Sequence, residues 1–447
     1  MNTIIINADI LNEGKIFRGH LEIENEIIKN VLPGELAEPR PDAAIVDAQG
    51  LLLMPGIIDD QVHFREPGLT AKADIFSESR AAAAGGVTSF MDMPNTSPPA
   101  DSLQLLEQKF EIAAQRSAVN YSFYLGASND NIAEIRQIDP ARICGLKLFM
   151  GSSTGNMLVD NPRALSAVFA ESPVIVAAHC EDENIIRTNL KLFRYTIGDD
   201  ADASIHPRVR DAEACFLSTR RALELAARYS ARLHVLHLST GAETRLFDPV
   251  SPDRPLPKVT AEACVHHLWF CDRDYKRLGN KIKCNPAIKS ATDRDALRNA
   301  VREGKVAVVA TDHAPHLRAE KQLGYFDAPS GLPLVQHSLS AMFELYRRGV
   351  FSLFDIVERM CHSPARLFGI RKRGFIRKDY YADLTLLDYN SPFSPAADNI
   401  LHKCRWSPFE GVQFSARPAK TWVNGTLVYD NGEIRETKAA KRLEFDR

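Results

Sequence analysis

Residues 51–68 of the chain read LLLMPGIIDDQVHFREPG. The stretch begins with apolar residues and passes into acidic, amide, imidazole and guanidinium side chains, which is typical of a buried strand that ends at the rim of a site. Gln61 and His63 are separated by one residue, so both side chains leave the same face of an extended segment, and Arg65 continues that face. Because the carboxyl ends of strands carry the chemistry in a parallel barrel, we place a functional site here.

Strand-like and helix-like patterns alternate through the middle of the chain. Besides the opening stretch, seven short apolar runs are typical of buried strands, at residues 87–91, 120–124, 146–150, 174–177, 233–236, 258–260 and 306–310. Helical patterns lie between them, for example over residues 101–117, where Asp101 is a suitable N-cap. Eight alternating units predict an α/β fold, a TIM-like (β/α)8 barrel.

The two ends of the chain share a different pattern. Residues 1–52 and 372–447 alternate short apolar bursts with Gly and Asn, and Asn424-Gly425 between two bursts is a strong hairpin signal. Neither end holds enough strands for a stable sheet, so we expect both to pair into one small composite β-sandwich domain. The predicted domains are therefore a barrel over residues 53–371 and a β domain built from both termini.

Composition limits the kind of partner and the compartment. At 447 residues the chain is long enough for a barrel and a smaller module. A formal net charge of −2 without a basic stripe argues against nucleic acid and membrane surfaces, so a small-molecule substrate is the default. No apolar run approaches membrane-spanning length. The eight cysteines are scattered without a CxxC motif, which favours a reduced, cytoplasmic compartment.

Side chains of the kinds that bind metals lie in or at the ends of five predicted strands. In chain order they are Gln61 and His63, Lys147, His179, His237 and Asp312. A single histidine at a strand end is more often a hydrogen-bonded structural residue, but this joint placement is hard to explain by packing. His234 alternates away from His237, and His266 and His267 are as readily structural as catalytic. We therefore predict a metal site at the barrel mouth.

Lys147 lies within an otherwise apolar strand. An ammonium group inside a barrel is costly unless it is paired, so one interpretation is a salt-bridged or snorkelling lysine. The other is that burial lowers the pKa, so that the neutral amine captures carbon dioxide and forms a carbamate able to bridge two cations. We favour the carbamate because cation ligands are expected nearby.

Six motifs in a fixed order give the chain a specific resemblance. They are DQVHFREPG at 60–68, DMPNT at 92–96, GLKLFM at 145–150, HLST at 237–240, EACVHHL at 262–268 and TDHAPH at 311–316. In these motifs the chain resembles the dihydroorotases, of the cyclic-amide hydrolase branch of the amidohydrolase superfamily, over nearly its whole length. The resemblance implies a zinc-dependent enzyme of pyrimidine (UMP) biosynthesis that interconverts N-carbamoyl-L-aspartate and L-dihydroorotate.

Transferred residue by residue, the resemblance assigns the metal ligands and the catalytic residue. The implied ligands of one or two zinc ions are His63, carbamylated Lys147, His179, His237 and Asp312. Asp312 would also be the general base and then the general acid, taking a proton from the attacking hydroxide and passing it to the departing ring nitrogen.

Four further residues match those that bind the substrate in that family: Arg65, Asn95 and His316 at the ring carboxylate, and Asn285 near the pyrimidine edge. An arginine can hold a carboxylate in a bidentate fork, and an amide and an imidazole add donors. Relatives of the allantoinase and dihydropyrimidinase type usually lack this arginine and the Pro-Asn-Thr sequence, which favours dihydroorotate. For Asn285 a turn before proline is nearly as good an interpretation.

Gln61 departs from the family pattern, which usually has His-x-His at this position. A carboxamide oxygen is a poor zinc ligand beside an imidazole, so we expect Gln61 to be a weak or absent ligand of the deeper metal. Three outcomes stay open: two metals, one metal, or a non-catalytic scaffold that partners another pyrimidine enzyme. A homodimer is expected from the resemblance alone. Residues 151–156 are small and polar enough to close over a ligand or to form an ordinary turn.

Overall fold

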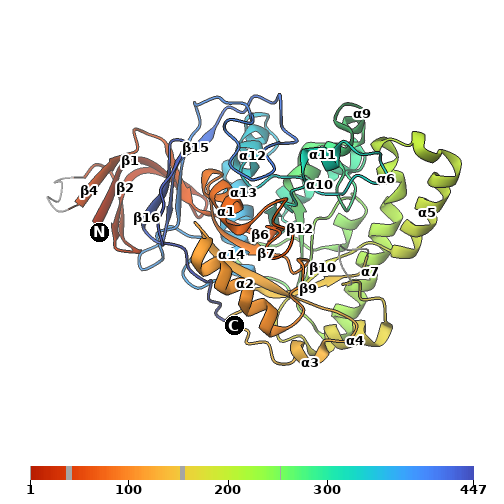
Figure 1. Cartoon of the computed structure of the whole chain (residues 1–447). Helices are drawn as coiled ribbons and strands as arrows, with labels where there is room; N and C mark the ends of the chain where they lie inside the picture. Colours follow the sequence, from red (N-terminus) through yellow and green to blue (C-terminus); the bar gives the residue numbers. More distant parts are fainter. Residues whose placement is uncertain (1, 37–42, 152–156, 252) are drawn as a thin grey trace.

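Eight parallel strands form a barrel in which chain order and spatial order agree. The computed structural model describes residues 2–36, 43–151, 157–251 and 253–447, and Figure 1 shows the barrel with a separate sheet beside it. The barrel strands are β6 (Ile57–Val62), β7 (Val87–Asp92), β8 (Asn120–Gly126), β9 (Gly145–Phe149), β10 (Val176–His179), β11 (Leu233–Val235), β12 (Val259–Cys264) and β13 (Val308–Ala310). The predicted (β/α)8 barrel is confirmed.

The barrel closes between its last and first strands, and the first strand pairs irregularly with its neighbour. The backbone N–H of His63 donates to the carbonyl of His313 at 2.7 Å, next to a bridge between Val62 and His313. The pairing of β6 with β7 shifts register between Asp59 and Val62. Such a bulge disturbs the simple alternation of side chains along a strand.

Helices cover the outside of the barrel (Figure 1). They are α1 (Ile75–Ala84), α2 (Leu103–Arg116), α3 (Ile132–Ile135), α4 (Pro162–Glu171), α5 (Glu183–Thr196), α6 (His206–Val209), α7 (Ala212–Tyr229), α8 (Val265–Trp269), α9 (Tyr275–Leu278), α10 (Ala291–Glu303), α11 (Arg318–Lys321), α12 (Ser338–Arg347), α13 (Leu353–Val357) and α14 (Ser363–Phe368). The cap predicted at Asp101 is wrong by one residue: Ser102 is extended and accepts the N–H of Leu105.

Strands from both ends of the chain form one nine-stranded sheet, which confirms the predicted pairing of the two termini. They are β1 (Asn2–Asn12), β2 (Lys15–Glu24), β3 (Ile27–Pro33), β4 (Ala43–Asp47), β5 (Leu52–Pro55), β14 (Leu384–Asp388), β15 (Arg417–Val423), β16 (Thr426–Asp430) and β17 (Glu433–Ile434). β14 pairs with β5 and so joins the two termini. Asn424 and Gly425 have φ of 48° and 74°, as the predicted hairpin requires. The domain limits at 52/53 and 371/372 stay a prediction.

Gly56 links the sheet to the barrel. It lies between β5 and β6, and a Cβ there would meet the side chain of Thr88 at 2.2 Å, so only glycine fits.

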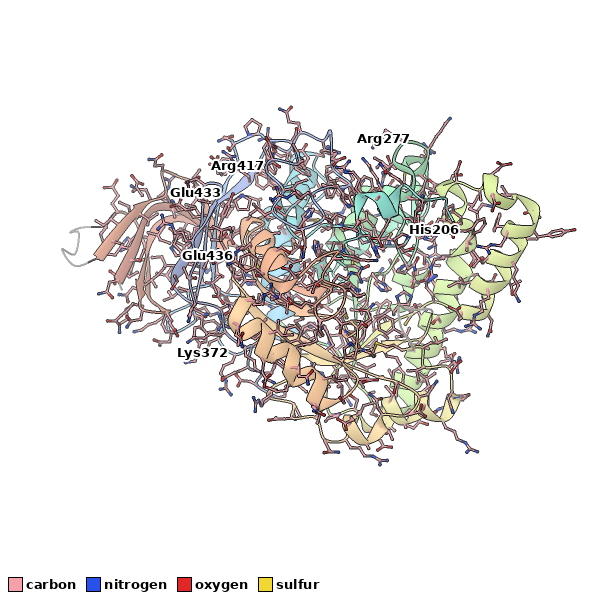
Figure 2. All side chains as sticks on the ribbon, in the orientation of Figure 1. His206, Arg277, Lys372, Arg417, Glu433 and Glu436 are labelled. Carbon is pink, nitrogen blue, oxygen red and sulfur yellow. The ribbon has the colours of Figure 1, made fainter. Side chains whose placement is uncertain are left out.

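Charged side chains such as Arg277, Lys372 and Arg417 point outward (Figure 2). All eight cysteines are buried and free. Among the described residues, no helix combines the length and the apolar composition that a membrane span needs.

Candidate active site

A pocket with about 500 Å³ of empty space opens where the barrel strands end. It is lined by Gln61, His63, Arg65, Asn95, Lys147, Phe149, His179, His237, Asn285, Asp312, Ala314, Ser330 and Gly331. Nine of the ten site residues predicted from the sequence are in this lining. The tenth, His316, contacts the lining, because its Nε2 lies 3.0 Å from the carbonyl oxygen of Ser330.

His179 and His237 turn their rings toward each other. Nδ1 of His179 lies 3.0 Å from Nε2 of His237. Burial lowers the pKa of both imidazoles, that of His237 strongly, so both rings are neutral and offer lone pairs. Two ligands of one tetrahedral zinc ion lie roughly 3.3 Å apart, so the spacing and chemistry of this pair fit a shared metal ion.

Glu181 and Arg210 hold His179 in place. Nε2 of His179 donates to Oε2 of Glu181 at 2.8 Å, so Nδ1 is left to face the pocket. The same oxygen lies 2.8 Å from Arg210 Nη2. Burial would raise the pKa of Glu181, but the charge of Arg210 and the bond from His179 lower it to about 2. Neither residue was predicted from the sequence, in which the one signal is that Glu181 follows His179 at strand spacing.

Lys147 lies on β9, lines the pocket together with these histidines, and is 1% exposed. Burial lowers the pKa of Lys147 to about 8, although the charges of Asp312 and Glu262 oppose the shift. Its Nζ lies 4.6 Å from the centroid of the Phe149 ring. With such a pKa about a tenth of the amine is neutral at pH 7, and this is the form that reacts with carbon dioxide.

His63 and Asp312 meet on the other side of the pocket. Nε2 of His63 lies 3.0 Å from Oδ1 of Asp312. Nδ1 of His63 donates to Oδ1 of Asn95 at 2.7 Å. Asn95, predicted only as a substrate residue, therefore also orients a metal-ligand candidate. The lone pair of Nε2 then faces a carboxylate oxygen, an arrangement that a cation between the two atoms would stabilise.

Gln61 joins this group as a hydrogen-bond donor. Its Nε2 lies 3.2 Å from Oδ1 of Asp312, and an ionised carboxylate only accepts, so the amide nitrogen faces Asp312. The amide oxygen faces the thiol of Cys264, with 3.9 Å between Sγ and Oε1. To bind a metal beside His63, this oxygen would have to exchange places with the nitrogen. The geometry thus supports the expectation that Gln61 is a weak or absent metal ligand. Its role at the metal stays a prediction.

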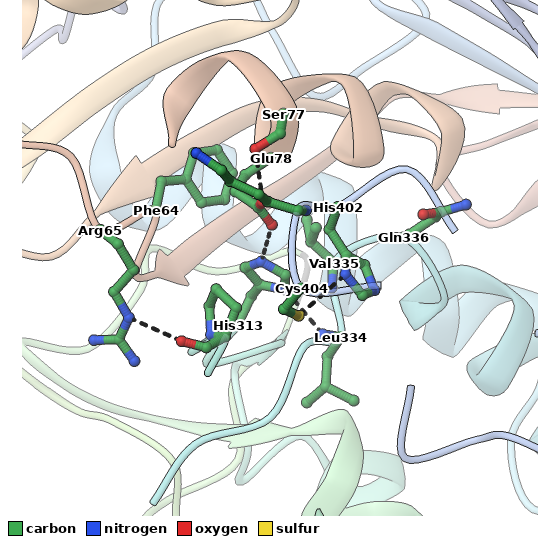
Figure 3. Close-up of polar contacts among 12 residues, drawn as sticks. Phe64, Arg65, Ser77, Glu78, His313, Leu334, Val335, Gln336, His402 and Cys404 are labelled. Carbon is green, nitrogen blue, oxygen red and sulfur yellow. Dashed lines mark hydrogen bonds and ion pairs between the residues drawn. The ribbon is translucent and has the colours of Figure 1, made fainter. Parts of the chain in front are cut away.

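His313 anchors the end of β13 next to Asp312 (Figure 3). Its Nε2 donates to Oε2 of Glu78 at 2.7 Å, and its Nδ1 accepts the backbone N–H groups of Leu334 and Val335 at 2.9 and 3.1 Å. Both ring nitrogens are therefore satisfied, and the tautomer is determined. No sequence signal pointed to Glu78, which reaches the site from α1.

Three pocket residues have a strained backbone. Arg65, His237 and Asp312 have φ of 67°, 39° and 47°, in the left-handed region that non-glycine residues rarely adopt. Such strain persists only where surrounding contacts enforce it, and it gathers at functional sites. Here it re-aims side chains that leave the ends of β6, β11 and β13.

Arg65 and His316 form a cationic end of the pocket. Lys72 Nζ lies 3.0 Å from Nδ1 of His316, and a lysine only donates, so the imidazole proton is on Nε2 and is given to Ser330. The contact of 3.2 Å between Arg65 Nη2 and His316 Nε2 therefore joins two donors. Nη2 of Arg65 therefore has no acceptor at His316, and an anionic oxygen of a ligand would supply one.

Asn285 and Gly331 line the remaining wall of the pocket, where Asn285 offers a hydrogen-bond acceptor and Gly331 lies in a closely packed loop. Oδ1 of Asn285 is buried and has no hydrogen-bond partner among the described residues, so an acceptor faces the pocket. Gly331 has φ of 142°, and a Cβ there would meet the carbonyl oxygen of Ala314 at 2.4 Å. The loop predicted at 151–156 lies, except for Gly151, outside the described residues.

Comparison of sequences agrees with this geometry. A model of the amidohydrolase family matches residues 52–428. The chain is 34% identical to the dihydroorotase of Halobacterium salinarum over 96% of this chain and 97% of that protein. It is 33% identical to the dihydroorotase of Methanothermobacter thermautotrophicus over 90% of each chain.

Solved structures with the same fold include cyclic-amide hydrolases. The L-hydantoinase (dihydropyrimidinase) from Arthrobacter aurescens superposes with a TM-score of 0.92 at 25% identity, over 99% of both chains. The dihydropyrimidinase from Brevibacillus agri superposes with a TM-score of 0.88 at 24% identity over both full chains, which supports the fold alone.

Proposed function

Because the chain belongs to the amidohydrolase family and, within it, to the dihydroorotases, we propose that it catalyses the reversible hydrolysis of the cyclic amide of L-dihydroorotate to N-carbamoyl-L-aspartate. One observation supports this substrate above others: the guanidinium group of Arg65, whose Nη2 finds no acceptor at His316, lies in the same pocket as the metal-ligand candidates. Dihydroorotate carries a ring carboxylate for the donors and an amide for the metal, whereas hydantoins and dihydropyrimidines lack the ring carboxylate.

We propose that His179, His237 and carbamylated Lys147 hold one zinc ion, with a second position at His63, Asp312 and the carbamate. Zinc supplies Lewis-acid polarisation of the scissile carbonyl and a water of lowered pKa. Glu181 and Asn95 set the imidazole tautomers that such binding requires.

Asp312 is assigned the proton transfers. Its Oδ1 accepts from Gln61 and faces Nε2 of His63, so we assign the moving proton to Oδ2. That oxygen takes a proton from the attacking water and delivers it to the ring nitrogen as the carbon–nitrogen bond breaks. Arg65 holds the ring carboxylate and so fixes the distance between Asp312 and the leaving nitrogen. Asn285 Oδ1 accepts a ring N–H.

The test is a spectrophotometric dihydroorotate assay on protein whose metal content has been measured, with dihydrouracil, hydantoin and allantoin as comparison substrates. We expect turnover of dihydroorotate and a loss of more than about 100-fold in kcat/KM for Arg65→Met, since a charged hydrogen-bond pair is removed. Turnover of the uncharged rings only would indicate a dihydropyrimidinase, and no turnover by zinc-loaded protein would indicate a scaffold. A homodimer and a cytoplasmic location stay predictions.

A further inference from the structure

Three buried side chains face one another across the interior of the barrel. They are Asp60 on β6, His234 on β11 and Glu262 on β12, each 0% exposed. β6 is not a neighbour of β11 or β12, so the contact crosses the barrel. Nε2 of His234 lies 3.4 Å from Oδ2 of Asp60 and 3.7 Å from Oε2 of Glu262. One nitrogen or oxygen of each residue lies within 4.8 Å of the others.

The atoms that meet there are not satisfied by the protein. Both carboxylate oxygens of Asp60, Oε2 of Glu262 and Nε2 of His234 have no hydrogen-bond partner among the described residues. A charged N–H···O bond is about 2.7–2.9 Å long, and the two distances from His234 exceed this. The other ring nitrogen of His234 lies 2.8 Å from Oγ1 of Thr260, which aims Nε2 at both carboxylates.

The cluster cannot stay buried with the charges of two free carboxylates. Burial lowers the pKa of His234, but the two carboxylates raise it overall to about 9, and burial together with the charge of Asp60 raises the pKa of Glu262 to about 7, so protons and a divalent cation compete for the same atoms. A buried charge without compensation is strongly unfavourable. One divalent cation neutralises the cluster. Ligands around zinc lie about 2.0–2.2 Å from the ion and therefore roughly 3.3 Å from one another, close to the observed separations.

We propose that Asp60, His234 and Glu262 bind a divalent cation of the zinc type, at a site distinct from the pocket and independent of the reaction catalysed there. The role is structural, because no surface of this site is open to a substrate. Oε1 of Glu262 accepts the backbone N–H of His237 at 3.1 Å. The cation would therefore hold Glu262, and through it the strained backbone of a pocket ligand.

Anomalous diffraction at the zinc edge, from crystals of the unmodified protein, tests the site directly. We expect a peak about 2.0–2.2 Å from Nε2 of His234 and from one oxygen each of Asp60 and Glu262. A map with a peak at His179 and His237 but none inside the barrel overturns the proposal. This result would leave the dihydroorotase proposal intact.

Variants give a second, independent measurement. Asp60→Asn keeps the size of the side chain but removes its charge, and we expect it to lower the zinc content by one equivalent per chain. Asp59→Asn is the matched control, because the carboxylate of Asp59 bonds instead to Thr311, and zinc content should not change. A folded Asp60→Asn protein with unchanged zinc content contradicts the proposal, and the diffraction test decides if this variant does not fold.

Discussion

Each imidazole that faces the pocket from His63 or His179 is oriented by a second side chain. Asn95 and Glu181 take one ring proton each, at 2.7 and 2.8 Å, and so leave the other nitrogen as a ligand. Gln61 fits this pattern as a donor to Asp312 rather than as a ligand. The hydrogen bonds of single residues therefore explain why His63 and His179 are suited to bind a metal ion and why Gln61 is not.

Gln61→His should strengthen the second metal position. The imidazole would replace an amide nitrogen with a good zinc ligand beside His63. We expect the affinity for a second equivalent of zinc to rise on the order of tenfold or more, as measured by titration against a chelating dye. Gln61→Met removes the donor without adding a ligand, and its zinc affinity should stay near that of the unmodified protein. A large loss of zinc in Gln61→Met would show that the amide is a ligand.

Lys147→Ala should lose pocket zinc and activity together, because the carbamate can no longer form. Short carboxylic acids such as acetate or propionate should restore part of both, since they can occupy the space and supply the missing oxygen ligands. Metal analysis and the dihydroorotate assay measure the two effects. Full activity of the variant without any added acid would rule out the carbamate.

The strands were predictable, but several contacts between them were not. Apolar residues that alternate along the sequence locate each strand and the end at which polar side chains follow it. Because these ends meet in one pocket, nine of the ten predicted residues line it. The pattern within one strand does not reveal which side chains of other strands or helices contact it, so Arg210 and Glu78 were not predicted. The bulge between Asp59 and Val62 lies outside simple alternation, and so does the meeting of Asp60 with His234.

The hydrogen bond from His313 to Glu78 of α1, at the end of β13, should make the fold sensitive to acid. Burial raises the pKa of Glu78, but the hydrogen bond from His313, the nearby imidazoles and the backbone N–H of Lys403 together lower it overall. A lowered pKa in the folded state stabilises the protein above the ordinary glutamate pKa of about 4.3. This contribution is lost as the pH falls from that value through the folded pKa.

Glu78→Gln should therefore cost about 2 kcal/mol of unfolding free energy at pH 7, and less as the pH falls below about 4.3. Urea unfolding at a series of pH values measures the difference. Glu213→Gln, at an exposed position of α7, is the control. A difference that is constant with pH would contradict the assigned ionisation of Glu78.

The loop at the pocket rim should tolerate no side chain at Gly331. A Cβ there would meet the Ala314 carbonyl oxygen at 2.4 Å, and φ of 142° is unfavourable for other residues. We expect Gly331→Ala to lower kcat/KM for dihydroorotate by about tenfold or more, because the displaced loop moves Ser330 and His316. Gly324→Ala is the matched control, since nothing lies within 4 Å of its added Cβ. Equal activity of the two variants would exclude a role for rim geometry.

The chain ties the terminal sheet to the barrel from both of its ends. β5 of the sheet continues through Gly56 into β6 of the barrel. The last residues of the chain return to the barrel, where Leu443 N donates to Tyr121 O at 2.9 Å and Phe445 N to Ala141 O at 3.1 Å. Because both ends of the chain connect the terminal sheet to the barrel, we expect the sheet and the barrel to unfold together in one transition.

Leu443→Ala should therefore destabilise both units, although it lies far from the pocket in sequence and removes no site residue. Leu443 is 0% exposed, and truncating such a side chain costs about 3 kcal/mol. We expect the midpoint of urea unfolding to fall equally when it is followed by tryptophan fluorescence, to which Trp422 of the sheet contributes, and by loss of barrel activity. Glu444→Gln, with an exposed carboxylate, is the control. Two separate transitions, with only one of them shifted, would show that the sheet and the barrel unfold independently.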